Sequence, residues 1–266
     1  MKNPKISVIM PVYNGMPFLK EAVQSVLSQT FTNFEFIIVD DNSNDQSPIY
    51  LKSLKDRRII LLTNTTNIGI ANSLNKAIKK ASGDYIARMD ADDISLPKRL
   101  ELEYAFLKNN QAISLCGGWS YRIDKNGKTI DSLKYSTNPY DIKKVLIYFN
   151  PIIHPTFFCE KAFFKNNLYN SDFEGAEDYE LLLRGIDKFN YANLPEFILK
   201  LRITKKSRSQ KEMKIVDLAD LRVKLSYLRR NPTKLTGYFA VVKKMIMTYL
   251  IPKNVKTKLV EVKYKL

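Results

Sequence analysis

Four short runs rich in Ile and Val recur along the first 90 residues, and each is followed by a segment long enough for a helix. The first two runs are almost continuously apolar, as strands must be when helices cover both faces of a parallel sheet. This alternation predicts a doubly wound, Rossmann-like α/β core with a mostly parallel sheet flanked by helices. The predicted strands are residues 6–12, 34–40, 58–63 and 85–89.

Apolar residues spaced by three and four between these runs predict helices that flank the sheet. A helix is also predicted over 99–109, because Pro97 suits its first turn. Two apolar segments around an Asn-Gly turn, 113–123 and 129–133, predict a strand pair that extends the sheet in mixed orientation. The later predicted elements are a helix over 139–149, a proline-punctuated loop over 150–155, a helix from Glu177 and strands around Tyr191 and Phe197.

The charge of the chain is unevenly distributed. The formal net charge is +16, and residues 203–266 carry 17 Lys and Arg against 4 Asp and Glu, which leaves only +3 for residues 1–202. We therefore predict a main domain over 1–202 and a basic helical extension over 203–266. Such an extension indicates contact with an anionic surface, for which anionic lipid and nucleic acid are the usual candidates.

The basic extension also contains an apolar helical face, with Lys234 and Lys243 flanking it. An interfacial membrane helix has this composition, since lysine stems can lie along apolar surface. A helix packed on the main domain is the other interpretation. No run reaches the roughly 18–20 apolar residues of a membrane-spanning helix. The face consists of Leu235, Tyr238, Phe239, Val242, Met245, Ile246 and Tyr249.

Only two cysteines are present, Cys116 and Cys159, and no CxxC pair occurs. The sequence therefore indicates neither a disulfide framework nor a thiolate zinc site, and a reducing cytoplasm fits. The N-terminal apolar run ends at Pro11 without a small-residue cleavage site, so we interpret it as the first strand. The expected location is cytoplasmic, peripheral on the inner face of the cell membrane through residues 203–266.

Polar residues follow each of the four predicted strands. Ligands of open α/β sheets bind beyond the carboxyl ends of the strands, so these residues are expected to gather in one crevice. The crevice would hold one aromatic ring, several amides and several carboxylates. The segments are Tyr13-Asn14-Gly15, Asp40-Asp41-Asn42-Ser43, Asn64 with Asn67, and Asp90-Ala91-Asp92-Asp93.

The sequence contains no Gly-rich phosphate loop, so another device must hold a diphosphate. Asp90 and Asp92 alternate along an extended segment and leave it on the same side, with the small Ala91 between them. Two carboxylates repel a diphosphate unless a divalent cation lies between, and Mg²⁺ or Mn²⁺ suits these oxygens. An Asp-rich turn or a helix N-cap is the alternative interpretation, and Asp93 alone is compatible with a turn.

The ordered motifs resemble those of family 2 inverting glycosyltransferases of the bacterial surface-polysaccharide type, which have the GT-A fold. The resemblance covers residues 4–202, and the order of five motifs is more specific than any one. The motifs are Pro11-Val12-Tyr13-Asn14, Val39-Asp40-Asp41-Asn42-Ser43, Asn67-Ile68-Gly69 with Leu74-Asn75, Asp90-Ala91-Asp92-Asp93, and Glu177-Asp178 with Leu181.

The resemblance implies roles for single positions. Tyr13 would lie near the nucleobase and Asp41 would accept from a uracil N–H, while Asp90 would face ribose and metal and Asp92 would bind the metal. Many members of the family carry Arg where this chain has Leu74, so a phosphate contact from that position is not expected. The donor-binding residues implied are Pro11, Val12, Tyr13, Asn14, Asp41, Asn75, Arg88, Asp90 and Ala91.

Inversion requires a carboxylate that takes the proton of the acceptor hydroxyl, and the resemblance implies Asp178. Acids in a helix's first turn, which favour the positive end of its dipole, are the other reading of this segment. Three residues are further candidates for contact with diphosphate, metal or acceptor: His154, Glu177 and Trp119. Core packing is the other interpretation for His154 and Trp119.

These observations predict a metal-dependent inverting transfer from a nucleotide sugar, expected to be a UDP-sugar, to a hydroxyl of a glycan or lipid-linked glycan. Mn²⁺ or Mg²⁺ is the expected cofactor. A sugar nucleotidyltransferase is one alternative, but it needs a Gly-rich, Arg-containing loop where this chain has Tyr13-Asn14-Gly15-Met16-Pro17. A basic nucleic-acid-binding protein is the other, and it leaves the ordered acidic motifs without a use.

Overall fold

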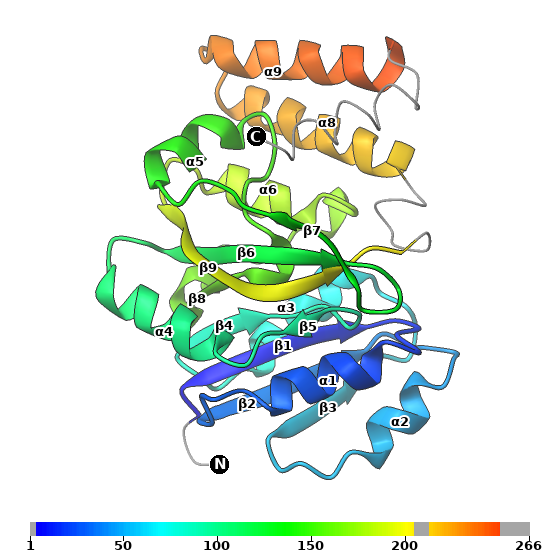
Figure 1. Cartoon of the computed structure of the whole chain (residues 1–266). Coiled ribbons are helices and arrows are strands. Elements are labelled where there is room, and N and C mark those ends of the chain that lie inside the picture. Colours follow the sequence, from blue (N-terminus) through cyan, green and yellow to red (C-terminus); the bar gives the residue numbers. More distant parts are fainter. Residues whose placement is uncertain (1–3, 205–212, 251–266) are drawn as a thin grey trace.

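The computed structural model describes residues 4–204 and 213–250 (Figure 1). Within them, nine strands form one sheet in the order β3, β2, β1, β4, β8, β6, β9, β5, with β7 paired to β6 outside this path. The strands are β1 Ile6–Val12, β2 Phe34–Asp40, β3 Ile59–Thr63, β4 Tyr85–Arg88, β5 Ile94–Ser95, β6 Leu115–Ile123, β7 Thr129–Leu133, β8 Phe158–Glu160 and β9 Tyr191–Arg202.

The first four strands are parallel, as predicted. All seven residues of β2 are buried, because helices pack on both faces of the sheet. Val8 and Met10 of β1 share a core with α1, whereas Ile9 between them shares a core with α3. The two-residue period of the strand therefore divides β1 between two apolar cores. The flanking helices are α1 Leu19–Leu27, α2 Ser47–Ser53 and α3 Ile70–Lys80.

The mixed extension of the sheet is confirmed. β8 runs antiparallel to both β4 and β6, β7 runs antiparallel to β6, and β9 runs parallel to β6. The prediction of separate strands around Tyr191 and Phe197 was wrong, because a single strand carries both. The pairing skips from Leu194 to Phe197, so Pro195 and Glu196 form an exposed irregularity. A bulge accommodates proline because its nitrogen has no proton to donate.

The predicted helix over 99–109 is confirmed as α4 (Arg99–Asn109), and α6 (Glu177–Arg184) begins at the predicted residue. The helix predicted over 139–149 ends earlier, as α5 (Pro139–Leu146). Three short 3₁₀ turns complete this half of the fold: η1 His154–Thr156, η2 Lys161–Phe164 and η3 Ser171–Phe173.

The described part of the basic extension forms α8 (Met213–Arg230) and α9 (Leu235–Met245), which continues as a π-helical turn, η4 (Ile246–Leu250). In Figure 1, α8 lies over α6 and α9 forms the outermost layer. Val223 and Tyr227 of α8 belong to the same apolar core as α6, so the extension is packed on the main domain. Among the described helices, none is both long and apolar enough to cross a membrane.

Candidate active site

The acidic segment that follows β4 brings three carboxylates together. Asp90, Asp92 and Asp93 each offer an oxygen within 4.8 Å of the others. Asp90 and Asp92 are partly exposed, whereas Asp93 is buried. Oxygen atoms from carboxylates are the ligands that hard divalent cations prefer. The residues therefore fit a divalent cation, with Asp90 and Asp92 at the accessible side.

The charges of this cluster are only partly compensated. The buried Arg88 guanidinium forms two contacts with Asp90, at 2.5 Å and 2.6 Å. Burial, and next the charge of Asp90, raise the pKa of Asp92 to about 6. Burial and the charges of Asp92 and Asp90 also raise the pKa of Asp93. A bound cation would relieve this repulsion, which is a second reason why the cluster fits a metal.

Arg202, the last residue of β9, supports the acidic segment and was not predicted. Its backbone N–H donates to Asp93 Oδ1 and its Nε donates to the Asp92 carbonyl, both at 2.8 Å. Its guanidinium also pairs with Glu21 at 2.5 Å and lies over the ring of Phe18. An arginine at the end of a strand carries no sequence signal of this role, because the contacts depend on how β9 pairs in the sheet.

The loop after β1 is tied to the loop after β2. The backbone N–H of Asn14 donates to Ser43 Oγ, and Asn14 Oδ1 accepts from the backbone N–H of Asn44 at 2.8 Å. Tyr13 is 53% exposed, so its ring is available for contact with a ligand. Val12 lies in the apolar core at 1% exposure, so its side chain does not line an open pocket. Pro11, one residue earlier on β1, is partly buried.

The two acids at the end of β2 differ in what their oxygens can still accept. Asp41 is buried, and its carboxylate accepts from Asn64 Nδ2, the Ile68 N–H and the Gly69 N–H at 2.8–2.9 Å. In the described structure, Asp40 accepts only one bond, from Ser43 N–H to Oδ1. Asp41 therefore organises the loop before α3, whereas Asp40, which is equally buried, has one carboxylate oxygen that accepts no bond from the described residues.

Asn75 also has its side-chain atoms engaged. Its Nδ2 donates to the Tyr169 carbonyl at 2.8 Å, and its Oδ1 accepts from the Tyr169 N–H at 3.0 Å. The Tyr169 hydroxyl in turn lies 3.0 Å from His154 Nε2. Asn75 is thus placed to hold Tyr169, and Tyr169 to orient His154, while each polar side-chain atom of Asn75 has one further hydrogen-bonding position.

His154 lies beside the charged part of the site. Its ring packs on Phe157 and Tyr169, at 4.9 Å and 5.5 Å between ring centroids. Burial and then the charge of Arg88 hold the pKa of His154 well below its usual value, so the imidazole is neutral near pH 7. A neutral imidazole can donate one hydrogen bond and accept another.

Asp178 stands in the first turn of α6 and is partly buried. Its Oδ2 accepts from Asn150 Nδ2 at 2.7 Å. Burial raises the pKa of Asp178, against the lowering effect of hydrogen bonds from the Tyr179 N–H and Asn150 and of the charge of Arg88. Arg88 therefore acts on both the acidic segment and Asp178, which joins the two parts of the predicted site electrostatically.

Two other predicted residues have structural contacts. The buried Glu177 accepts from the Gly175 N–H at 2.7 Å through Oε2, within the turn that enters α6. Trp119 packs on Phe197 and donates from Nε1 to the Tyr135 carbonyl at 3.0 Å, with Lys134 over its ring. These contacts fit the packing interpretation of Trp119.

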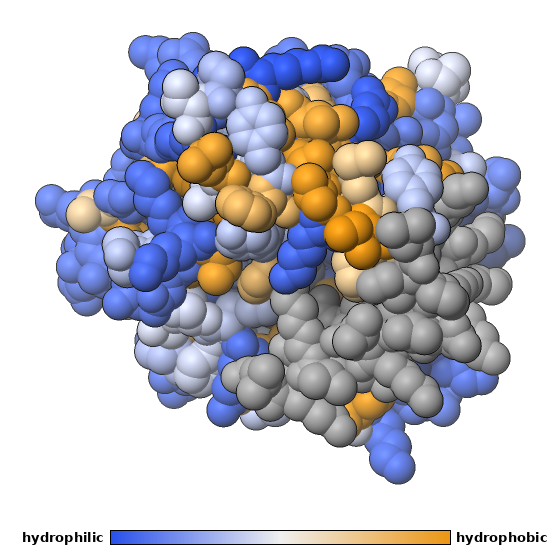
Figure 2. Space-filling model, turned by 90° about the horizontal axis from the view of Figure 1, so that it is seen from above, coloured by the Kyte–Doolittle hydropathy of each residue, from blue (hydrophilic) through white to orange (hydrophobic). Residues whose placement is uncertain are grey.

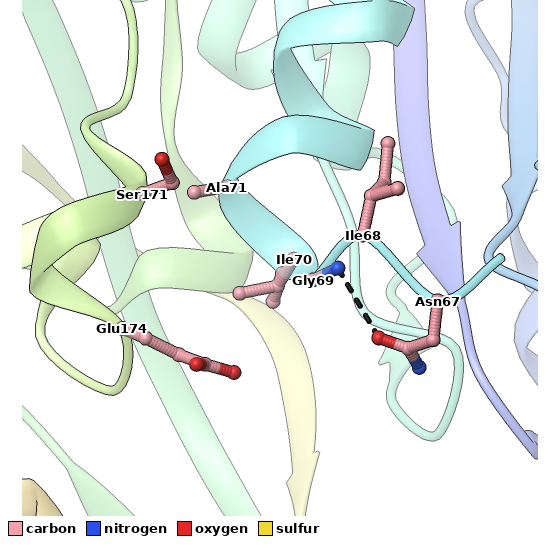
Figure 3. A pocket seen from close by; sticks show the side chains of 7 residues that line it. All are labelled: Asn67, Ile68, Gly69, Ile70, Ala71, Ser171 and Glu174. Carbon is pink, nitrogen blue, oxygen red and sulfur yellow. Dashed lines mark hydrogen bonds between the residues drawn. The ribbon is translucent and has the colours of Figure 1, made fainter.

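A cavity of about 230 Å³ opens where α3 begins, between the loop before α3 and η3 (Figure 3). Asn67 Oδ1 accepts from the Gly69 N–H at 3.2 Å, and Gly69 adopts a φ of +82°, a conformation that glycine allows. Because Asp41 binds the same loop, the cavity adjoins the end of β2. Its lining residues are Asn67, Ile68, Gly69, Ile70, Ala71, Ser171 and Glu174.

The acidic cluster at the carboxyl ends of the parallel strands is a candidate active site, and sequence comparison gives the family of the chain. The family model described as Glycosyl transferase family 2 matches residues 7–170. The chain belongs to glycosyl transferase family 2 and is a glycosyltransferase enzyme. The alternatives of a nucleotidyltransferase and of a basic nucleic-acid-binding protein are thereby set aside as identities of this domain.

Two curated relatives match most of the chain. An uncharacterized glycosyltransferase of Methanocaldococcus jannaschii is 37% identical over 76% of this chain and 72% of its own length. The O-antigen biosynthesis glycosyltransferase WbnJ of Escherichia coli is 34% identical over 86% of this chain and 91% of its own length. The chain spans between 26% and 66% of the length of three further relatives.

Solved structures share the fold. S. aureus TarS 1–349 in complex with UDP has a TM-score of 0.67 at 18% identity, covering 94% of this chain and 73% of that one. The mannosyltransferase PcManGT from Pyrobaculum calidifontis, in complex with GDP-Man and Mn²⁺, has a TM-score of 0.64 at 16% identity, covering 98% and 80%. The predicted GT-A fold is confirmed by these likenesses.

Proposed function

We propose that the protein transfers a sugar from a nucleotide sugar to an acceptor hydroxyl in a metal-dependent reaction that inverts the anomeric centre. The observation that carries the proposal is the convergence of Asp90, Asp92 and Asp93 at the carboxyl end of β4. Tyr13 is exposed at the end of β1, and Asp40 at the end of β2 has an oxygen without a bond in the described structure. Because β2, β1 and β4 are consecutive strands of the sheet, we propose that these two residues contact the nucleoside of the donor.

Asp92, with Asp90, is the proposed ligand set for Mn²⁺ or Mg²⁺. The Mn²⁺ in the structure of the P. calidifontis mannosyltransferase supports a divalent cation in this fold. When bound, such a cation neutralises the charge that develops on a leaving nucleoside diphosphate. Arg88 holds Asp90 in place through the paired contacts, and Arg202 holds the backbone of Asp92. These contacts preorganise the oxygens before the donor arrives.

Asp178 is the proposed base. In an inverting transfer the acceptor oxygen attacks the face opposite the leaving group, so the proton acceptor must act from the side of the sugar away from the diphosphate. Asp178 is proposed for this position because it stands on α6, whereas the acidic segment follows β4. Asn150 orients the carboxylate and stabilises its ionised form, while burial keeps its basicity above that of an exposed aspartate.

A UDP-sugar is the proposed donor, and S. aureus TarS with bound UDP supports a uridine nucleotide in this fold. The proposed acceptor is a hydroxyl of a glycan or lipid-linked glycan in surface-polysaccharide assembly, supported by the named activity of the E. coli relative in O-antigen biosynthesis. The proposed place of reaction is the cytoplasmic leaflet of the cell membrane. This is supported by residues 203–266, which contain 17 basic and 4 acidic residues.

The proposal is tested by release of nucleoside diphosphate from a panel of UDP- and GDP-sugars, with Mn²⁺, with Mg²⁺ and with EDTA. Turnover of one donor, lost in EDTA, is expected. Proton NMR of the first product formed then gives the anomeric configuration, which is expected to be opposite to that of the donor. Turnover that is unchanged in EDTA would contradict the proposed metal dependence. A product with the same anomeric configuration as the donor would contradict the role of Asp178 as the base of a single displacement.

A further inference from the structure

The outermost helix, α9, packs on the protein through its small residues. Gly237, Ala240 and Val241 are buried against α8. A Cβ added at Gly237 would lie 2.4 Å from a methyl carbon of Leu228, so the two helices approach closely because this position has no side chain. The packing of α9 on the protein therefore uses small residues rather than the large apolar residues of the face noted in the sequence.

Those large residues point outward instead. Leu235 is 72% exposed and Phe239 is 70% exposed. Seen from above, apolar side chains gather over the part of the surface that α9 occupies (Figure 2). Soluble monomers rarely leave a contiguous apolar patch of this kind without a partner. The outer face of α9, which η4 continues, consists of Leu235, Tyr238, Phe239, Val242 and Met245 on α9 and of Ile246 and Tyr249 on η4, all of them at least 44% exposed.

The charge around this face is positive. Lys243 is exposed, and so are Arg229 and Arg230 at the end of α8. The two acids of α8 point the other way, because Asp217 and Asp220 pair with Lys244 on the inner side of α9 at 2.9 Å and 2.8 Å. The two acids of α8 are thus withdrawn beneath α9, and Lys234, the residue before α9, pairs with the exposed Asp187 at 3.2 Å, whereas Lys243, Arg229 and Arg230 are exposed cations.

Aromatic hydroxyls also border the face. Tyr148, next to α5, is 37% exposed, and Lys243 lies 5.8 Å from the centre of its ring. Tyr238 and Tyr249 lie on the face itself. Tyrosine and lysine combine an apolar body with a polar end, which suits a boundary between hydrocarbon and water.

We propose that the outer face of α9 docks on the surface of an anionic lipid bilayer, with the helix lying in the plane of the interface. The occupant is a lipid surface because the apolar stripe, the bordering cations and the inward-turned acids all match it. This goes beyond sugar transfer and assigns the membrane contact to particular side chains. α8 separates α9 from α6, and Lys224 of α8 lies over the ring of Tyr179, the neighbour of Asp178. Docking therefore presents the α6 side of the site toward the bilayer.

The experiment is flotation of the full-length protein with vesicles, either of neutral phosphatidylcholine or containing about one third anionic phosphatidylglycerol. Wild type is expected to bind the anionic vesicles and to bind them less as salt rises. The double variant Leu235→Ser, Phe239→Ser is expected to lose about tenfold or more in partitioning, since two large apolar side chains no longer enter the interface. Both residues are exposed, so the melting temperature is expected to be unchanged.

The matched control is Ile49→Ser, Ile130→Ser, which removes two apolar side chains that are 66% and 58% exposed on α2 and β7. This variant is expected to float like wild type. Equal binding by wild type and the Leu235/Phe239 variant would overturn the proposal, as would absence of wild-type binding to anionic vesicles at low salt. A self-association lost in the Leu235/Phe239 variant, without vesicle binding, would assign the face to a second copy. Because no nucleotide sugar is added, vesicle binding can be interpreted even if the proposed sugar transfer is not observed.

Discussion

At the residue scale, Asp178 and Asn150 form a pair whose titration can be followed. The base must be ionised to accept a proton, and burial raises the pKa of Asp178. We therefore expect kcat/KM to fall as pH decreases, with its acid limb above the ordinary aspartate pKa of about 3.9. Asn150→Ala removes a donor that favours the ionised form, so the limb is expected to move to higher pH. An acid limb at the same pH in Asn150→Ala as in wild type would contradict this pairing.

Asp178→Asn is the companion change. It keeps the shape of the side chain and removes the proton acceptor, so kcat is expected to fall by about 10²–10⁴-fold. Donor affinity, measured by calorimetry with the nucleotide, is expected to stay within about twofold of wild type. A variant that transfers sugar at the wild-type rate would remove Asp178 from the role of base.

Asp40 and Asp41 provide a second pair at the residue scale. Asp41→Ala leaves the Ile68 N–H without its acceptor and the Gly69 N–H with only the longer bond to Asn67, so the free energy of unfolding is expected to fall by about 2 kcal/mol. Asp40→Asn is expected to weaken nucleotide binding with little change in stability. Denaturant unfolding and calorimetry of both variants separate the two effects. If Asp41→Ala weakened nucleotide binding and Asp40→Asn lowered stability, the result would support Asp41 as the nucleobase contact that the family resemblance implies.

The sequence predicted which residue types gather at the site, because the ends of parallel strands meet at one edge of a sheet. It could not predict which of two adjacent acids has its oxygens engaged. That depends on the Asn64 amide and on the loop before α3, which reach Asp41 from 23 to 28 residues away. The contact of Asn75 with Tyr169, 94 residues away, is likewise invisible in the sequence, and the nucleotide contact that the family resemblance implies for Asn75 stays a prediction.

At the scale of elements, the link between β9 and the acidic segment carries a prediction. Arg202→Lys keeps the positive charge but loses the planar group that reaches the Asp92 carbonyl and Glu21 at once. Residues that orient metal ligands typically change metal affinity by about 10–100-fold when replaced. We expect Mn²⁺ affinity, measured by electron paramagnetic resonance, to fall within that range. Unchanged affinity would show that the acidic segment holds its shape without Arg202.

Elements with a strong local pattern were predicted from the sequence. β1, β2 and α4 have the predicted bounds, since apolar runs and helical spacing are local signals. The continuity of β9 was missed because Pro195 suggests an interruption, and only pairing with β6 shows that the strand resumes beyond it. Pairing of distant strands leaves no trace in one sequence.

At the scale of the whole molecule, helix α8 of the basic extension is part of the folded core. Val223 and Tyr227 of α8 are buried together with Tyr179 and Leu182 of α6. A chain that ends at residue 202 would expose this surface, and each large side chain contributes roughly 1.5–3 kcal/mol on burial. We expect such a chain to have a markedly lower melting temperature than the full chain, or to be insoluble. Equal melting temperatures would show that residues 1–202 fold as an independent domain.

The proposed function depends above all on Asp90 and Asp92, with the buried Asp93 beside them, as the site of the metal and the diphosphate. The most direct measurement is calorimetric affinity for UDP with Mn²⁺ and with EDTA, in wild type, in Asp92→Asn and in Asp141→Asn, a matched change of an exposed acid on α5. Affinity is expected to be at least about tenfold tighter with Mn²⁺ in wild type and Asp141→Asn, but not in Asp92→Asn. Equal UDP affinity with and without metal in wild type, or a full metal effect in Asp92→Asn, would contradict the claim.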